Sequence, residues 1–163
     1  MKSTSSTLNL TQRQKRLVRE SFESVKEYSD SVVLLFYGRL FELAPQTRGL
    51  FKIGIRAQAA KLMDTLTNLV EALDRFEELR KDLTDLGRRH AEYKVEPAHY
   101  QVLVTAITWA FGQALGIEFD AETRAAWVEL LRAVSAVMIA GASEVDAQPD
   151  PTSGSPAAPA AGR

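Results

Sequence analysis

The stretch Gln101–Leu115, QVLVTAITWAFGQAL, spaces its apolar side chains by three and four residues. The series consists of Leu103, Val104, Ile107, Phe111 and Leu115. This spacing matches one face of an α-helix, which repeats every 3.6 residues, and not the alternation of a half-buried strand. Pro97 suits the first turn of such a helix, because the N–H that proline lacks would have no partner there. The pattern therefore predicts a helix with one buried face over residues 97–115.

The same spacing recurs on both sides of this stretch. One series comprises Leu62, Leu66, Leu69, Val70 and Leu73, and a later one Trp127, Leu130, Leu131, Val134, Val137 and Met138. Thr11 with Gln14 is typical of a capping box, and Asp120 is a good N-cap for the last helix. We expect an all-α fold with helices at 11–27, 30–44, 45–51, 55–74, 77–92 (broken near Leu83), 97–115 and 120–146.

Composition narrows the classes of function. The chain has 163 residues, with 20 Lys and Arg, 21 Asp and Glu, no Cys and two His. A balanced charge disfavours nucleic acid as a partner, and a chain without Cys forms no disulfide and no thiolate metal site. No apolar run is long enough to predict a membrane span or a signal peptide, so we expect a cytoplasmic protein.

The prolines mark the boundaries of the folded part. Four of the six lie in the last fifteen residues, among Ala, Ser and Gly. Such a composition buries too little apolar surface to offset its ordering entropy. We expect a flexible segment at 1–9, one folded domain at 10–146 and a disordered tail at 147–163.

Two histidines are the first candidates for metal or acid–base chemistry. His90 shares a helical face with Leu83 and Leu86, so its imidazole should point toward the apolar interior. It is either a hydrogen-bonded core residue or a ligand, and the spacing favours the core residue. His99 follows Pro97 by two residues, in the first turn of a helix, and we expect it to be exposed.

Three other residues admit both a structural and a functional interpretation. Gln58 lies on the apolar face that continues as Leu62, where its amide either reaches water or donates to a ligand. Tyr37 lies among apolar residues, so its hydroxyl needs a partner if it is buried. Phe51 either packs in the core or forms a wall against a flat ligand. Neither a Ser/His/Asp set nor a phosphate-binding Gly loop is present, so these residues alone name no ligand.

The order Tyr37, Phe51, Gln58, His90 along a helical chain resembles the globin family. The likeness is to bacterial single-domain haemoglobins and to the globin domain of flavohaemoglobins. The resembling segments are Leu35–Phe41 with Pro45 and Leu50–Phe51, Gln58–Met63, Leu86–His90 through Tyr93, Val95, Pro97 and Tyr100, and Ala126–Trp127. They cover about residues 30 to 140, so the resemblance implies a globin fold of six to eight helices around a haem pocket.

The resemblance also implies a cofactor and roles for individual residues. Haem b would bind with His90 as the proximal ligand to iron and Phe51 stacked on the porphyrin. Tyr37 and Gln58 would be the distal pair, whose donors stabilise the partial negative charge of bound dioxygen. The remaining positions are Leu62, which would restrict the distal cavity, Leu86, Val95 and Leu103, which would line the haem, and Lys61, which would pair with a propionate.

The chain departs from the flavohaemoglobin pattern near the proximal histidine. In that family a Tyr and a Glu form a hydrogen-bonded network with the histidine. Tyr100 matches the Tyr, but Ala142 stands where the Glu is expected, and Glu144 points about 200° around the helix. We therefore expect an incomplete network.

These implications define the expected function. Tight, slowly released dioxygen, with nitric oxide and carbon monoxide as further ligands, would suit conversion of nitric oxide to nitrate. We expect no flavin or nicotinamide domain in the chain, so turnover would require an external flavin/NAD(P)H reductase. Oxygen storage or transport is the alternative, and a haem-free interaction module or an oxygen sensor is less favoured.

Overall fold

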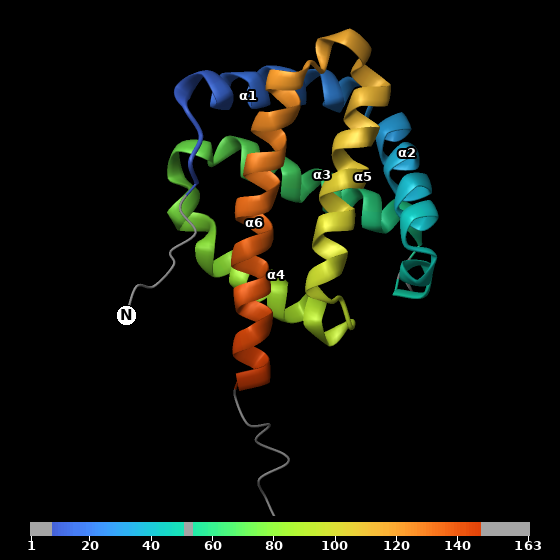
Figure 1. Ribbon diagram of the computed structural model, residues 1–163, viewed down its shortest axis with the longest axis vertical. Helices are drawn as coiled ribbons and strands as arrows, with labels where there is room; N and C mark the ends of the chain where they lie inside the picture. Colours follow the sequence, from blue (N-terminus) through green and yellow to red (C-terminus); the bar gives the residue numbers. More distant parts are fainter. Residues whose placement is uncertain (1–7, 51–53, 148–163) are drawn as a thin grey trace, which may run out of the picture.

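The computed structural model describes residues 8–50 and 54–147, and within these ranges the chain is helical with no strand (Figure 1). The elements in order are α1 (Gln12–Glu27), α2 (Ser29–Leu43), the 3-10 helix η1 (Pro45–Leu50), α3 (Ile55–Glu71), the 3-10 helix η2 (Leu73–Leu79), α4 (Arg80–Glu92), α5 (Pro97–Leu115), the 3-10 helix η3 (Gly116–Glu118) and α6 (Ala121–Ala147). The predicted all-α fold is confirmed. Phe51 and the tail 148–163 lie outside the described residues.

The capping signals in the sequence mark the starts of three helices. The Thr11 side chain accepts a hydrogen bond from the Gln14 backbone, while the Gln14 side chain accepts one from the Thr11 N–H, which completes the predicted capping box. Asp120 Oδ1 accepts from Thr123 N at 2.8 Å, and Pro97 is the first residue of α5. Thr11 and Asp120 accept hydrogen bonds from N–H groups that a helix leaves unpaired at its start, and Pro97 has no N–H to leave unpaired.

The predicted break near Leu83 is wrong. Leu83 lies inside the continuous helix α4 and is 4% exposed. The chain instead turns in η2, where Arg75 leaves the helical region with φ −133° and ψ 35°. This corner lets Leu73 and Phe76 both reach the core. No Gly or Pro marks the turn, so local propensity could not locate it.

A buried aromatic cluster joins α1 to α5 and α6. Trp127 of α6 is fully buried, and its ring lies 4.9 Å from that of Phe111 in α5 and 6.0 Å from that of Phe22 in α1. The indole Nε1 donates to Ser21 Oγ at 2.8 Å, so the polar edge of the buried ring is satisfied. Leu8, within the segment predicted to be flexible, also packs against the core.

The helices are arranged as crossed layers. In Figure 1, α5 and α6 run side by side in opposite directions, α1 crosses one end of this pair, and α3 crosses behind it. The helix α2 packs on α5, and α4 packs on α6. Both α5 and α6 are long and apolar enough to cross a membrane, but about half of each lies buried inside the fold, as expected for core helices.

Two glycines let α4 and α6 approach closely. A Cβ at Gly87 would collide with the carbonyl oxygen of Met138, and one at Gly141 with the carbonyl oxygen of Thr84. The two backbones therefore touch where both helices lack a side chain. This contact fixes α4, the helix that carries His90, against the longest helix of the fold.

Candidate haem site

His90 is held at the inner side of α4 by a backbone hydrogen bond. Its Nδ1 lies 2.8 Å from the carbonyl oxygen of Leu86, one helical turn earlier. A carbonyl oxygen only accepts, so Nδ1 carries the proton and Nε2 keeps the lone pair that a metal requires. The side chain is half-buried, and burial lowers the pKa of His90 below its ordinary value, which favours the neutral imidazole.

Tyr100 of α5 stacks beside this histidine. The two ring centroids are 6.4 Å apart, with an angle of 30° between the rings. The Tyr100 hydroxyl is buried and has no hydrogen-bond partner in the described part of the chain. Burial raises the pKa of Tyr100 to about 12, so the hydroxyl stays protonated. Ala142, at the position where the resemblance implies a Glu, is half-buried on α6 and has no carboxylate.

The second histidine has a structural role. His99 is partly buried rather than exposed, and its Nδ1 accepts a hydrogen bond from Glu96 N at 2.9 Å. This bond is half of a reciprocal cap at the start of α5. The imidazole therefore occupies a helix terminus, and the two histidines differ clearly in environment.

Tyr37 lies deep in α2. It is 4% exposed, and its ring lies 4.9 Å from that of Phe36 and 6.0 Å from that of Phe41. Burial raises the pKa of Tyr37 to about 12. The phenol is therefore a hydrogen-bond donor throughout the neutral range.

The beginning of α3 carries three of the predicted site residues. Gln58 and Leu62 are half-buried and lie one turn apart on the same face, while Lys61 is exposed. The glutamine amide is thus near the rim of the core, where it can reach a ligand and water. The assembly of these three residues with Tyr37 and His90 around one ligand stays a prediction.

The apolar residues assigned to the pocket share an intermediate exposure. Leu62, Leu86, Val95 and Leu103 all pack against the core without being fully covered by it. Val95 follows the corner after α4, where Lys94 has φ 63° and Val95 N donates to His90 O at 3.0 Å. Apolar side chains left partly exposed in this way are suited to contact with an apolar ligand.

The structure adds residues that the sequence prediction missed. Phe41 and Met63 are also partly buried against the core, and Phe41 lies one turn after Tyr37 on α2. The carbonyl of Leu86 is the partner of His90. The i, i+4 spacing from Tyr37 and His90 was the signal that could have identified Phe41 and the Leu86 carbonyl.

The helical fold and the geometry around His90 can now be compared with known families of proteins. The family model named Globin matches residues 34–138, and the chain belongs to the globin family. Among its relatives, a cytoglobin-1 from Oryzias latipes is 26% identical over 137 residues, covering 75% of this chain and 77% of the relative. An anaerobic nitrite reductase from Oryza sativa subsp. indica is 28% identical over 131 residues, covering 75% and 88%.

The chain is also similar to a protein of Aquifex aeolicus and to a solved structure. An uncharacterised globin-like protein from Aquifex aeolicus is 25% identical over 134 residues, covering 82% of this chain and 95% of the relative. The solved structure is an engineered carbene transferase derived from a proposed nitric oxide dioxygenase of Rhodothermus marinus. It has a TM-score of 0.77 and 24% sequence identity, and the match covers 85% of this chain and 97% of that one. At this identity the likeness shows the fold.

Globins generally bind haem, and the residues of this chain fit that cofactor. His90 presents an Nε2 lone pair, the adjacent Tyr100 keeps a buried hydroxyl without a partner, and the surrounding leucines keep apolar surface uncovered. In the described ranges no group of three metal-ligating side chains occurs. A single imidazole is enough for haem, because the porphyrin itself holds the iron.

Proposed function

We propose that this globin binds haem b through His90, holds dioxygen tightly, and converts nitric oxide to nitrate when a separate flavin/NAD(P)H reductase supplies electrons. The overall reaction joins one nitric oxide, one dioxygen and one electron to give one nitrate. The observation that carries the proposal is the hydrogen bond from His90 Nδ1 to the Leu86 carbonyl, which leaves Nε2 available as a ligand.

Each residue of the site has a defined task. His90 would hold the iron, Leu86, Val95 and Leu103 would cover the porphyrin, and Phe51 would stack on it. Lys61, exposed on α3, would pair with a propionate. When bound, haem supplies an iron that binds dioxygen, nitric oxide and carbon monoxide and exchanges single electrons.

The distal donors determine how slowly oxygen leaves. Tyr37 keeps its proton because burial raises its pKa to about 12, and Gln58 adds an amide donor at the rim of the core. Each hydrogen bond to a partly charged acceptor in an apolar pocket contributes roughly 1 to 2 kcal/mol. Two such bonds slow release by about one to three powers of ten. Slow release favours reaction of oxygen in place over its delivery elsewhere.

Oxygen storage without an enzymatic role is the second candidate. The observation that favours it is the Tyr100 hydroxyl, which has no partner among the described residues where a carboxylate would complete a network with the histidine. Within the described part of the chain, the hydrogen-bond partner of the histidine is a backbone carbonyl. This arrangement favours stable oxygen binding over repeated electron transfer.

Visible spectroscopy of the protein purified with added haem tests the proposal. We expect a Soret band that shifts on reduction by dithionite and shifts again with oxygen and with carbon monoxide. A chain that takes up no haem would refute both candidates. Nitric oxide consumption with a flavin reductase and NADH then separates them: many nitrate molecules per haem support the enzyme, whereas a single turnover supports storage.

A further inference from the structure

Acidic and basic residues are segregated along the middle of the chain. Residues 43–63 contain four basic residues and no acidic one, whereas residues 64–85 contain seven acidic and three basic residues. The first segment covers η1 and the beginning of α3, and the second covers the end of α3, η2 and the beginning of α4. The nearly neutral protein therefore has a strongly uneven surface charge.

We call residues 43–63 the basic segment and residues 64–85 the acidic segment. Most described cations outside the basic segment form an ion pair. Asp74 of η2 accepts from Lys15 and Arg19 of α1, both at 2.9 Å, and Glu77 accepts from Arg80 at 2.8 Å. Arg16, Lys81, Arg124 and Arg132 are also exposed and have no ion pair with a described residue, but they lie away from the site residues in the sequence. Five further exposed cations of this kind lie close to residues assigned to the candidate site, and we call this set of five the basic rim. It comprises Arg48, Arg56, Lys61, Arg89 and Lys94.

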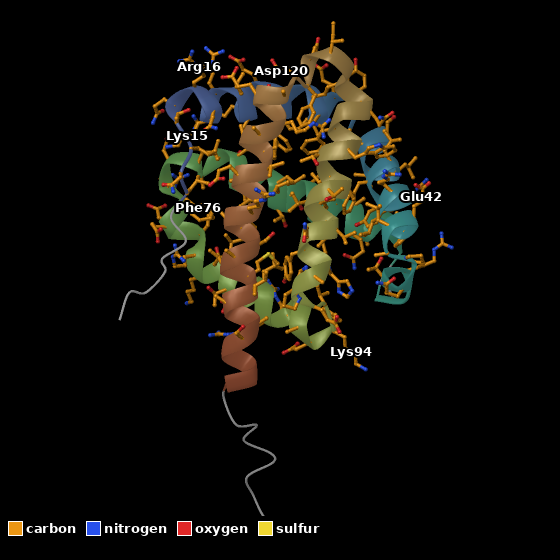
Figure 2. All side chains as sticks on the ribbon, viewed as in Figure 1. Lys15, Arg16, Glu42, Phe76, Lys94 and Asp120 are labelled. Carbon is orange, nitrogen blue, oxygen red and sulfur yellow. The ribbon has the colours of Figure 1, made fainter. Side chains whose placement is uncertain are left out.

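Each residue of the basic rim is close, in sequence or in space, to a residue assigned to the candidate site. Lys61 immediately precedes Leu62, Arg89 immediately precedes His90, and Lys94 immediately precedes Val95. Arg56 lies two residues before Gln58, and the Arg48 guanidinium lies 5.0 Å from the Phe41 ring. In Figure 2, Lys94 lies at the lower end of the helices, whereas Phe76, a buried residue between the acidic side chains of η2, lies at the left.

Five unpaired cations exceed what the bound cofactor needs. Haem brings two propionates, so most of the basic rim would keep its charge in the loaded protein. Exposed like charges repel one another, and a surface of one sign attracts a partner of the opposite sign over about a Debye length. The charge therefore fits an acidic partner that approaches the edge of the site.

We infer that the basic rim docks the acidic face of a flavoprotein that donates electrons to this globin. The inference rests on the proposed function, because it assigns the docking surface of the external reductase. In the step that it serves, the reduced flavin loses one electron and the haem gains it, with no bond formed or broken. Docking at the rim brings the donor to the edge of the site, where the path for the electron is short.

Cross-linking tests the docking without any turnover. The purified protein is mixed with flavodoxin, a small acidic flavoprotein, at low ionic strength. A zero-length carbodiimide then joins carboxylates to lysines, and mass spectrometry locates the links. We expect links at Lys61 and Lys94, which disappear at high salt, and few at Lys81, an exposed lysine in the acidic segment. Links at Lys81 as frequent as those at Lys61 would overturn the inference. This result does not depend on haem, so it stands apart from a failure of the proposed function.

Charge reversal gives a second test, with a matched control. The test variant combines Arg48→Glu with Arg56→Glu, and the control combines Arg16→Glu with Lys81→Glu. All four residues are exposed and lack a described ion pair, and both variants change the net charge by the same amount. We expect the test variant to slow reduction by flavodoxin about tenfold or more, and the control at most about threefold.

Two results would contradict docking at the rim. Equal slowing of the two variants would show that only net charge matters. The test variant should also be reduced by dithionite, a small dianion. If its reduction by dithionite is slowed as much as its reduction by flavodoxin, the rim attracts small anions and does not dock a protein. Raising the ionic strength to about 0.3 M should remove most of the difference between the variants, because salt screens exposed charges.

Discussion

At the scale of single residues, two buried phenols dominate the chemistry of the candidate site. Tyr37 and Tyr100 are each 4% exposed, and burial raises the pKa of each to about 12. Both remain protonated near neutral pH, so each is a donor. Tyr37 is assigned to the distal side, and Tyr100 stacks on His90, so the two hydroxyls should have separable effects.

Tyr37→Phe isolates the distal donor. We expect the oxygen dissociation rate to rise at least about tenfold, because the variant removes one hydrogen bond to a partly charged ligand and keeps the ring. Stopped-flow displacement of oxygen by carbon monoxide measures this rate. Tyr93→Phe, at an exposed tyrosine just after α4, is the control and should leave the rate unchanged. An unchanged rate in Tyr37→Phe would remove this residue from the site.

The same phenol predicts a loss of stability in alkali. The unfolded chain releases the tyrosine proton near pH 10, whereas the folded protein holds it until about pH 12. The contribution is therefore intact below pH 10, and stability falls as the pH rises from 10 to 12. The loss is about 2 kcal/mol for Tyr37, by linkage. Urea unfolding at pH 9 and pH 11.5 should show a smaller decrease in Tyr37→Phe than in Tyr93→Phe. Equal decreases would contradict the burial effect.

Some properties of the site residues could be predicted from the sequence, and others could not. Helical spacing predicts that His90 faces inward and that Tyr37 is buried, because both properties follow from neighbours within two turns. The carbonyl partner of His90 also lies one turn away and could have been predicted. The lack of a carboxylate partner for the Tyr100 hydroxyl was expected from Ala142, whereas the burial of this hydroxyl was not, since it depends on how α5 packs against the other helices. The roles of Tyr37 and Gln58 rest on family resemblance, and spacing alone left both open.

At the scale of elements, the contact between α4 and α6 positions the candidate ligand. Gly87 lies three residues before His90, and a side chain there would meet the backbone of α6 at Met138. Backbone cannot move aside as a flexible side chain can, so the helices would have to separate. The position of His90 therefore depends on two residues without side chains on two different helices.

Gly87→Ala tests this contact. Although alanine favours a helix by about 1 kcal/mol over glycine, we expect a net destabilisation of about 2 kcal/mol or more, because the added methyl overpacks a backbone contact. Gly38→Ala in α2 is the control: a Cβ there meets nothing within 4 Å, so this variant should be stabilised by about 0.5 to 1 kcal/mol. Urea unfolding compares the two. Stabilisation of both would show that α4 and α6 are not in backbone contact.

Helix starts were predictable, whereas the corner between α3 and α4 was not. Thr11, Asp120 and Pro97 act within their own turns, so local sequence locates the helices that they begin. The corner at Arg75 arises because Leu73 and Phe76 must both be buried against distant helices. The contact of Gly87 with α6 is likewise determined by tertiary packing. The type of each element thus follows from the spacing of apolar residues and from the capping residues. The angles between elements do not follow from them.

At the scale of the whole molecule, the cofactor and the fold should stabilise each other. A ligand that binds only the folded state raises the free energy of unfolding. The increase grows with the ratio of the ligand concentration to the dissociation constant. The partly exposed leucines and the half-buried His90 would become covered on binding. Haem should therefore raise the unfolding midpoint, and the size of the rise should report which histidine ligates.

Replacing each histidine in turn by alanine shows whether His90 or His99 is the haem ligand. With stoichiometric haem, we expect His90→Ala to lose most of the rise in midpoint, since at a ligand concentration 100 times the dissociation constant binding adds about 2.7 kcal/mol. His99→Ala removes the cap of α5, so it should lower the midpoint with and without haem by the same amount and keep the rise itself. Thermal unfolding followed by circular dichroism measures both, and imidazole should restore part of the rise in His90→Ala. If His99→Ala loses the rise and His90→Ala keeps it, the ligand is on α5, and the site built around the Leu86 carbonyl is wrong.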